Sequence, residues 1–468
     1  MNRRALAVIA VLALAWGGPA DADQDSDLDL IPSAAPAPVT AAPAASVGAH
    51  RRIYLENATT QVAAVTDPAV PLPPPPGYLW QERLLLDVRQ DRPLGEHAQL
   101  FLSDRLNVRD EDDLRFPDHE DVVNDLREAY LSWHPSDRLY VDAGRINLKS
   151  GIALGYNPTD FFKTRSVSEP LSQDPTVLRE DRLGTLMLRA QRIWEGGSLT
   201  LAYVPGIHQA SPIYSNDDLP SFNPMFDRTN ADDRLLLKGS VDFGDNASPE
   251  LLLYREAGRT RYGTNLSMGL GQSAVAYLEW SGGERPDLIT AALDYGRDTG
   301  TLPAGAPSPL PTASNRTFKS EMALGLSYTT SNDITFNLEY LVDQAGFSRA
   351  DWADWFTEGT HAAPGSPLLD ELWYIRGYAR DQQQQNTRQA YFVRADWVDA
   401  FDIKLELTGF VLADAYDGSG LAQLSASYYL SDRWTIGALG VKYFGSRSSD
   451  FGSLGTSYSL LFSVTHYL

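Results

Sequence analysis

The sequence predicts an all-β fold, a single transmembrane antiparallel β-barrel of about 16–18 strands with short periplasmic turns and long extracellular loops. The clearest indication is the segment pair 318–328 and 334–342, which the turn 330–333 joins. Apolar and polar residues alternate in both strands, so that Leu324 lies on one face of the first strand and Glu321 on the other. A period of two places one face in an apolar medium and the other in water. Over a whole domain, that pattern is what a membrane barrel needs.

The bulk composition agrees with this fold class. The chain has 468 residues, of which 43% are hydrophobic, yet no apolar run reaches the about 18 residues of a membrane-spanning helix. Cysteine is absent, which excludes disulfides and thiolate metal sites. The net charge of −22 argues against nucleic acid as a partner.

The N-terminus has the features of an export signal. Arg3 and Arg4 precede the apolar stretch 5–16, and the small-residue sequence 20–22 offers a cleavage site. This order of basic, apolar and small residues predicts a signal peptide over residues 1–22.

The remaining chain divides into a linker and a barrel. Residues 23–77 are a low-complexity stretch rich in Ala and Pro, in which 53–65 could supply one strand. From 78 to 468 about 17 strand-like segments follow, and the additional strand makes about 18, an even number as barrels require. The predicted long connections are 149–181, 206–231, 282–316 and 345–388.

Tryptophan placement supports two aromatic girdles at the membrane surfaces. Most of these residues lie beside predicted short turns and the others at the opposite strand ends: Trp133, Trp194, Trp397 and Trp434 in the first group, Trp80 and Trp280 in the second.

Charged residues on the polar face of the strands are the candidates for a pore lining, because charges that face lipid are costly. They are Arg83, Arg89, Arg105, Glu128, Arg189, Arg234, Lys238, Glu279, Glu321, Glu339, Asp396 and Glu406. The earlier strands contribute mostly basic residues and the later ones mostly acidic residues. Two interpretations stay open: opposed walls of charge set a transverse field across a narrow pore, or neighbouring charges pair and solvate the wall.

The segment 151–163 is the most distinctive local sequence. Its Asn-Pro pair starts a turn and the next polar residues can cap a short helix, whereas two consecutive Phe need an apolar environment. We therefore expect the segment to fold against the inner wall and to narrow the pore. The expected constriction residues are Asn157, Pro158, Thr159, Asp160, Phe161 and Phe162.

This segment follows Gly144-Arg145 and resembles a sequence in porin-like outer-membrane barrels of Gram-negative bacteria. More broadly, the chain resembles porins and polysaccharide-export barrels. The resemblance implies a location in the outer membrane, in contact with lipid and lipopolysaccharide, insertion by the barrel-assembly machinery, and passage of small or extended polar molecules. It leaves a homo-oligomer open.

Two loops have additional features. Segments 350–356 and 368–376 read as short helices with apolar faces, which could cap the mouth, plug it or pack on each other. Carboxylates are dense in 110–125, but the spacing of a Ca²⁺-binding loop is absent, so a solvated loop is expected there rather than a metal site.

The expected function is a porin-like channel for small polar or charged solutes, with no cofactor. The alternatives are an exporter for an anionic exopolysaccharide and a non-conducting surface-binding barrel. An enzyme is not expected, because neither a Gly-x-Ser-x-Gly nor a His-Glu-x-x-His motif is present. The only histidines expected at the outer rim are His208 and His361.

Overall fold

The computed structural model describes residues 50–72, 79–111, 122–167, 172–213, 222–243, 247–305, 308–311 and 316–468. The predicted signal peptide and the predicted linker up to residue 49 lie outside this range. Among the described residues, no helix is both long enough and apolar enough to span a membrane.

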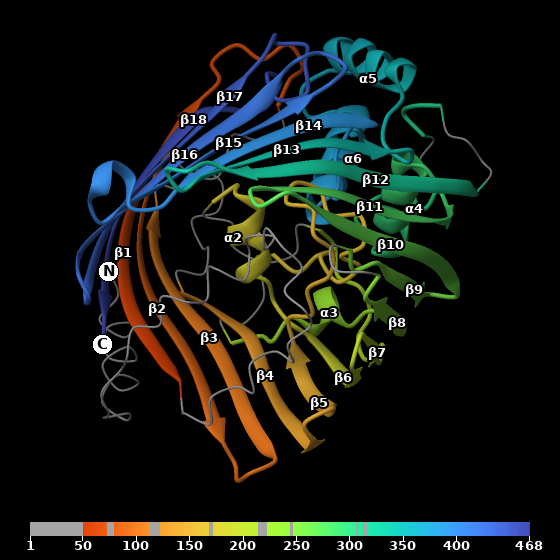
Figure 1. Ribbon diagram of the computed structural model, residues 1–468. Coiled ribbons are helices and arrows are strands. Elements are labelled where there is room, and N and C mark those ends of the chain that lie inside the picture. Colours follow the sequence, from red (N-terminus) through yellow and green to blue (C-terminus); the bar gives the residue numbers. More distant parts are fainter. Residues whose placement is uncertain are drawn as a thin grey trace.

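The chain forms one closed sheet of 18 antiparallel strands, in which each strand pairs with its neighbours in sequence (Figure 1). The strands are β1 (Arg51–Ala64), β2 (Trp80–Pro93), β3 (Ala98–Glu111), β4 (Val122–Ser136), β5 (Leu139–Ile146), β6 (Thr185–Trp194), β7 (Gly197–Val204), β8 (Arg234–Val241), β9 (Glu250–Glu256), β10 (Arg259–Leu270), β11 (Ala274–Arg285), β12 (Thr317–Thr329), β13 (Ile334–Asp343), β14 (Gln389–Trp397), β15 (Leu405–Asp414), β16 (Gly420–Ser431), β17 (Trp434–Phe444) and β18 (Thr456–Tyr467). The predicted barrel and its larger strand number are confirmed.

Strand β1 closes the barrel. It pairs with β2 on one side and with β18 on the other, where Tyr54 lies opposite Tyr467. It corresponds to the strand expected near 53–65 inside the linker. Residues 51–64 therefore belong to the wall of the barrel.

The connections sort by length on the two ends of the barrel, as the sequence indicated. Short turns such as 195–196 and 432–433 lie at one end, and the long connections 147–184 and 344–388 lie at the other. Two connections at the long-loop end are also short: 415–419 joins β15 to β16, and only Ala257-Gly258 joins β9 to β10. Ala257 and Gly258 both have positive φ, at 47° and 77°.

The wall alternates as a membrane barrel requires. On β12 and β13 the outward-facing Leu324 and Leu338 are 52% and 53% exposed, whereas the inward-facing Glu321 and Glu339 are 6% and 0% exposed. An apolar exterior of this kind suits hydrocarbon. Exposed tryptophans stand at the short-turn ends of three strands, namely Trp133, Trp194 and Trp434, and the exposed Trp80 stands at the long-loop end of β2.

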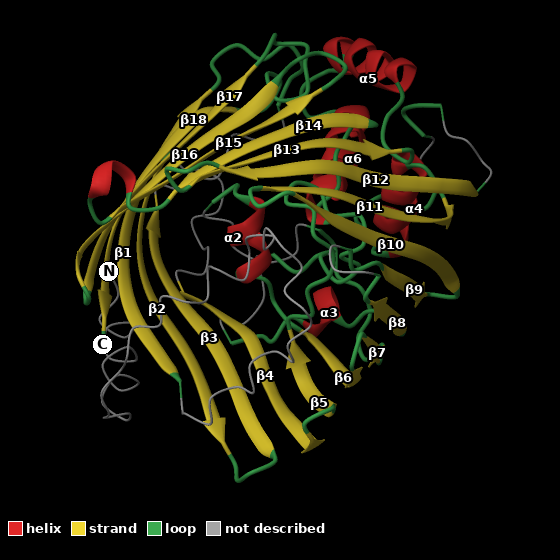
Figure 2. Cartoon of the chain, in the orientation of Figure 1, coloured by secondary structure: helices red, strands yellow, loops and turns green. Residues whose placement is uncertain are grey.

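In the part of the chain that the structure describes, helices occur only in the connections (Figure 2). Helices α4 (Leu288–Asp298), α5 (Arg349–His361) and α6 (Pro367–Asp381) share one apolar cluster at the long-loop end. Trp355 Nε1 donates to Leu372 O at 3.0 Å, which joins α5 to α6. The prediction of two helices in this loop is confirmed, and they pack on each other and on α4. The short helices α2 (Pro175–Glu180) and α3 (Phe226–Thr229) lie within the ring of strands (Figure 1).

Candidate functional site

The predicted lining residues all lie on the inward face of the wall. Neighbouring residues of a strand face opposite sides of the wall. Arg189 follows Leu188, which is 52% exposed on the outward face, and Arg234 precedes Leu235, which is 40% exposed on that face. The same alternation turns the others inward: Arg83, Arg89, Arg105, Glu128, Lys238, Glu279, Glu321, Glu339, Asp396 and Glu406.

Most of these charges have an opposite charge beside them. Arg83 contacts Glu56 at 2.5 Å, Arg189 contacts Asp142 at 2.6 Å, and Lys238 contacts Glu250 at 3.3 Å. On the acidic side, Glu321 pairs with Arg261 at 3.2 Å and with Arg285. Asp396 pairs with Arg394 at 2.7 Å. The charges of these residues are therefore balanced locally, as in the second of the two interpretations, rather than segregated on opposed walls.

Glu279 has a different role, because it holds a loop. Its carboxylate accepts hydrogen bonds from the backbone N–H groups of Ile152 and Ala153, both at 2.9 Å, and of Thr159 at 2.6 Å. The Thr159 hydroxyl donates to it as well, at 2.9 Å. Glu279 is fully buried, and no cation pairs with it among the described residues. Hydrogen bonds therefore offset the cost of burying its charge.

Glu339 extends this anchor to the adjoining backbone. It accepts from the N–H groups of Leu154 at 2.6 Å and Gly155 at 2.9 Å, and from the Tyr277 hydroxyl at 2.7 Å. Two glutamates of β11 and β13 thus fix residues 152–159 to the inner wall. Both glutamates face inward, as their strand positions predict, and the loop covers them, which no local pattern indicates.

The predicted constriction residues lie on this wall, and the two Phe have an apolar environment there. Phe161 stacks on Tyr254 of β9 with ring centroids 4.5 Å apart, and Phe162 meets the same ring edge-on at 5.9 Å. Arg261 and Arg234 cover the two Phe rings from β10 and β8. These aromatic and cation–π contacts oppose displacement of the segment.

The polar residues of the segment fix its turn. The Asn157 side chain donates to Ser150 O at 3.0 Å and accepts from Asp160 N at 3.0 Å. Asp160 pairs with Arg182 at 2.5 Å and lies 3.6 Å from Arg179, so the start of the loop is tied to its end. Pro158 follows Asn157 in the same turn.

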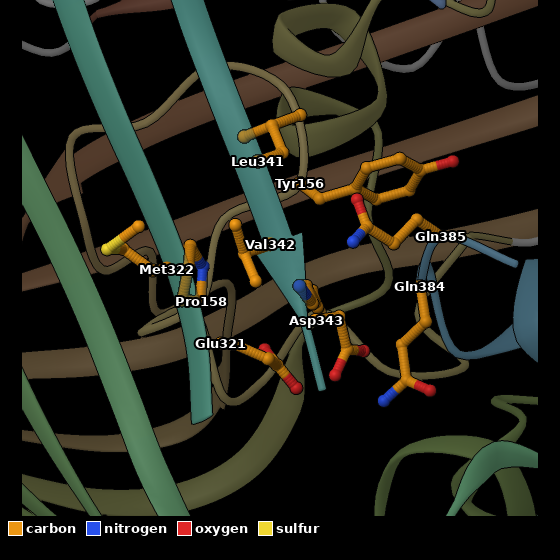
Figure 3. A pocket seen from close by; sticks show the side chains of 10 residues that line it. Tyr156, Pro158, Glu321, Met322, Leu341, Val342, Asp343, Gln384 and Gln385 are labelled. Carbon is orange, nitrogen blue, oxygen red and sulfur yellow. The ribbon is translucent and has the colours of Figure 1, made fainter. Parts of the chain in front are cut away.

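A small cavity lies between this loop and β12–β13 (Figure 3). Tyr156, Pro158, Glu321, Asp343 and Gln385 are among the residues that line a cavity of only about 10 Å³ there. That volume has room for about one water molecule. This cavity is therefore too small for a solute larger than water.

The end of the same loop crosses the barrel. We call residues 172–182, which include α2, the crossbar. At one end Gln173 N donates to Gln423 of β16 at 2.8 Å, and Asp174 pairs with Arg394 of β14. At the other end Asp181 contacts Arg105 of β3 at 2.8 Å.

Arg127 of β4 completes this second anchor. It lies 3.3 Å from Asp181 and 2.6 Å from Asp87, which Arg105 also contacts. The crossbar therefore spans the lumen between distant strands, and α2 is seen inside the ring in Figure 1.

Sequence reasoning missed the crossbar acids Asp174 and Asp181 and their partner Arg127. One signal was available: Asp174 precedes Pro175, and an Asp at the N-cap followed by Pro at the first helical position is a helix start. The structure has this cap, with the Asp174 side chain accepting from Thr176 N at 2.9 Å.

The rim histidines are not brought together. His361 Nδ1 lies 2.6 Å from Thr357 O within α5, and His208 lies beside Phe226. The described residues also contain no group of three or more His, Asp or Glu that could hold a metal ion. Most of the acidic loop 110–125 lies outside the described residues.

Asp450, in the connection 445–455 at the long-loop end, is the clearest buried titratable group outside the strands. Arg376 of α6 donates to it at 2.9 Å and Asn386 at 2.8 Å. Burial raises the pKa of Asp450 to about 6, although Arg376 opposes the rise. The cap of helices therefore contains a group that titrates in a mildly acidic range.

No family model and no curated protein matches the chain, but solved structures do. OccK5 (OpdH) of Pseudomonas aeruginosa aligns with a TM-score of 0.52 and 9% identity over 90% of this chain and 98% of its own. OccK11 (OpdR) of the same organism gives 0.51 and 10% over 90% and 96%. A BenF-like porin from Pseudomonas fluorescens Pf-5 gives 0.51 and 10% over 90% and 98%. At such low identity the likeness establishes the fold alone, and this chain has the closed barrel fold of these proteins.

Proposed function

We propose that the protein is a channel in the outer membrane of a Gram-negative bacterium, through which small polar or charged solutes pass. The observation that carries the proposal is the crossbar. This charged segment is anchored by ion pairs at both ends and crosses the lumen of the closed barrel. A solute that traverses the lumen passes the crossbar, where the Asp181 side chain is partly exposed. Mixed charge at a constriction selects solutes by size and charge.

The wall on β16–β18 supports an aqueous path beside the crossbar. Its inward positions carry small residues that are partly exposed on the inner face, including Ser425, Ser427, Gly437 and Ser463. Their outward neighbours Leu424 and Phe462 are each 61% exposed. Short side chains on this part of the inner face leave room for water.

The proposal fixes an orientation. By analogy with barrels of this fold, the long loops face the outside and the short turns face the periplasm. Lipid and lipopolysaccharide then surround the outward face, and the barrel-assembly machinery inserts the chain.

A non-conducting surface-binding barrel is the second candidate, and the helices α4, α5 and α6 at the long-loop end favour it. They share an apolar cluster with Val70, and Trp373 Nε1 donates to Pro71 O at 2.9 Å. An exporter of anionic polysaccharide is disfavoured, because Asp87, Asp142 and Glu250 interrupt any continuous basic track.

Planar-bilayer recording of the purified protein distinguishes these functions. We expect discrete conductance steps, and a reversal potential in a salt gradient that reports the charge preference. A protein that inserts but stays silent would support the non-conducting barrel.

Arg189→Glu gives this recording a residue-level test. The change places a second carboxylate beside Asp142 on the inner wall, so selectivity should shift toward cations. Arg192→Glu is the matched control, since Arg192 lies on the same strand with the outward parity of Leu188. Equal selectivity of the two variants would remove Arg189 from the conducting path.

A further inference from the structure

A groove of about 550 Å³ lies on the outward face of the wall and spans β14–β18. Its floor consists of small residues on adjacent strands, namely Ala395, Gly409, Ala422 and Gly440. The register places Ala395 opposite Gly409, so that two positions without bulky side chains adjoin. Exposed side chains such as Leu424 stand beside them. The groove is therefore a gap in an otherwise bulky apolar surface.

The groove needs an occupant in a membrane. An unfilled apolar hollow forfeits dispersion contacts along its lining, and lipid chains or a partner surface restore them. Both glycines tolerate a side chain: a Cβ on Gly409 would meet Leu424 at 3.6 Å, and one on Gly440 would meet Leu460 at 3.4 Å. Local packing therefore does not require glycine at these two positions.

Lys442 indicates the chemistry of the occupant. It is exposed on the outward face, lines the groove and lies opposite Ala422 and Tyr458 in the sheet. Its Nζ lies 5.7 Å from the centre of the Tyr458 ring. Among the described residues, no carboxylate pairs with it. An outward-facing cation at the margin of a hydrocarbon-facing wall is stabilised by an anionic headgroup.

Lys442 also lies near the long-loop end of the barrel. It is two residues from the end of β17 at Phe444, where the chain enters the connection 445–455 of the long-loop end. In the orientation of the proposed function, which this step assumes, that end faces the outer leaflet. The phosphorylated lipid of that leaflet is lipopolysaccharide.

We propose that this surface binds the lipid A part of lipopolysaccharide, with an acyl chain in the groove and a phosphate at Lys442. A second copy of the chain could also cover the small residues. It would have to bring a carboxylate to an apolar face to match Lys442, whereas lipid A carries the acyl chain and the anion in one molecule.

Native mass spectrometry of the purified, delipidated protein with added bisphosphorylated lipid A tests the proposal. Lys442→Gln should weaken lipid A binding about fivefold, the effect of one basic residue near an anionic headgroup. The double variant Gly409→Leu/Gly440→Leu should weaken it as well, because the new side chains fill the groove. Arg255→Gln, which removes an exposed cation at the long-loop end of β9, should leave binding unchanged.

Three results would overturn the proposal. The first is equal lipid A binding by Lys442→Gln and Arg255→Gln. The second is equal binding of phosphatidylglycerol and lipid A by the wild type. The third is a loss of oligomer mass in the glycine double variant without any loss of lipid A, which would assign the groove to a second copy. Single-channel recordings of the same variants test the channel separately, and heat-modifiable gel mobility reports whether each variant is folded.

Discussion

At Glu279 a single carboxylate on β11 fixes three separate residues of a loop that begins far away in the sequence. The donors are two consecutive N–H groups and both polar groups of Thr159. Because Glu279 is buried and its partners are neutral, its charge is stabilised by dipoles alone. Such an anchor should weaken when the side chain loses its charge, even if its volume stays nearly the same.

Glu279→Gln should loosen the loop. The amide side chain keeps one acceptor oxygen but loses the charge and the second oxygen, at a cost of about 1–3 kcal/mol in loop docking. We expect larger or noisier conductance steps in planar bilayers, because residues 152–159 become free to move. Thr435→Ala on β17 is the control, since it trims an inward-facing hydroxyl that makes no hydrogen bond with the described residues. Indistinguishable traces from wild type and Glu279→Gln would exclude the anchor role.

Asp450 gives a pH dependence. The pKa of Asp450 is 3.8 in the unfolded chain and is raised to about 6 in the folded protein, so the protonated carboxyl stabilises the fold. This contribution is fully present below pH 3.8 and is lost as the pH rises through 6. Relative to Asp450→Asn, the wild-type cap should therefore lose up to about 3 kcal/mol of local stability between pH 4 and about 7. Hydrogen exchange of α6, corrected for intrinsic rates, measures this difference. A constant difference across the range would contradict the buried, titrating carboxyl.

At the scale of elements, the crossbar depends on ion pairs at its two ends. Asp181 is the shared partner of Arg105 and Arg127, and Asp87 still contacts both arginines when that charge is removed. Asp181→Asn should therefore shift selectivity toward anions and raise conductance. The control is Asp432→Asn, which removes the same charge at an exposed short turn. Reversal potentials of the two variants measure the effect, and an equal shift in both would show that Asp181 acts only through net charge.

Strand β1 is the element on which closure depends. It pairs with β2 and β18, so every interior backbone N–H of the strand faces a neighbour, and Pro is not tolerated at such positions. Thr59→Pro should prevent closure and abolish the heat-modifiable gel band of the folded barrel. Thr59→Ala should retain the band. A folded Thr59→Pro protein would indicate that the barrel closes without this strand.

At the scale of the whole molecule, local patterns predicted the wall but not what fills it. Alternation alone assigned Arg189 and Glu339 to the inward face, because side-chain direction in a strand has a period of two. The strand near 53–65 was only an option, since its alternation is poor and its partners lie at both ends of the chain.

The interior depends on contacts that no local pattern encodes. Gln173 and Gln423 are 250 residues apart, and Thr159 and Glu279 are 120 apart. The sequence therefore predicted that residues 157–162 turn toward the wall, because two Phe need burial, but not which glutamates receive them. It also could not reveal the crossbar, whose acids find their arginines only after the barrel closes.

The most direct test of the channel is to measure which face of the wall water reaches. The natural absence of cysteine allows single thiols at Ser425, Ser463, Leu424 and Phe462 to be probed in lipid vesicles with a charged, membrane-impermeant thiol reagent. We predict rapid modification at Ser425 and Ser463, which face the lumen, and protection at Leu424 and Phe462, which face hydrocarbon. Equal modification at all four positions, or protection at the two serines, would contradict a water-filled barrel in a membrane.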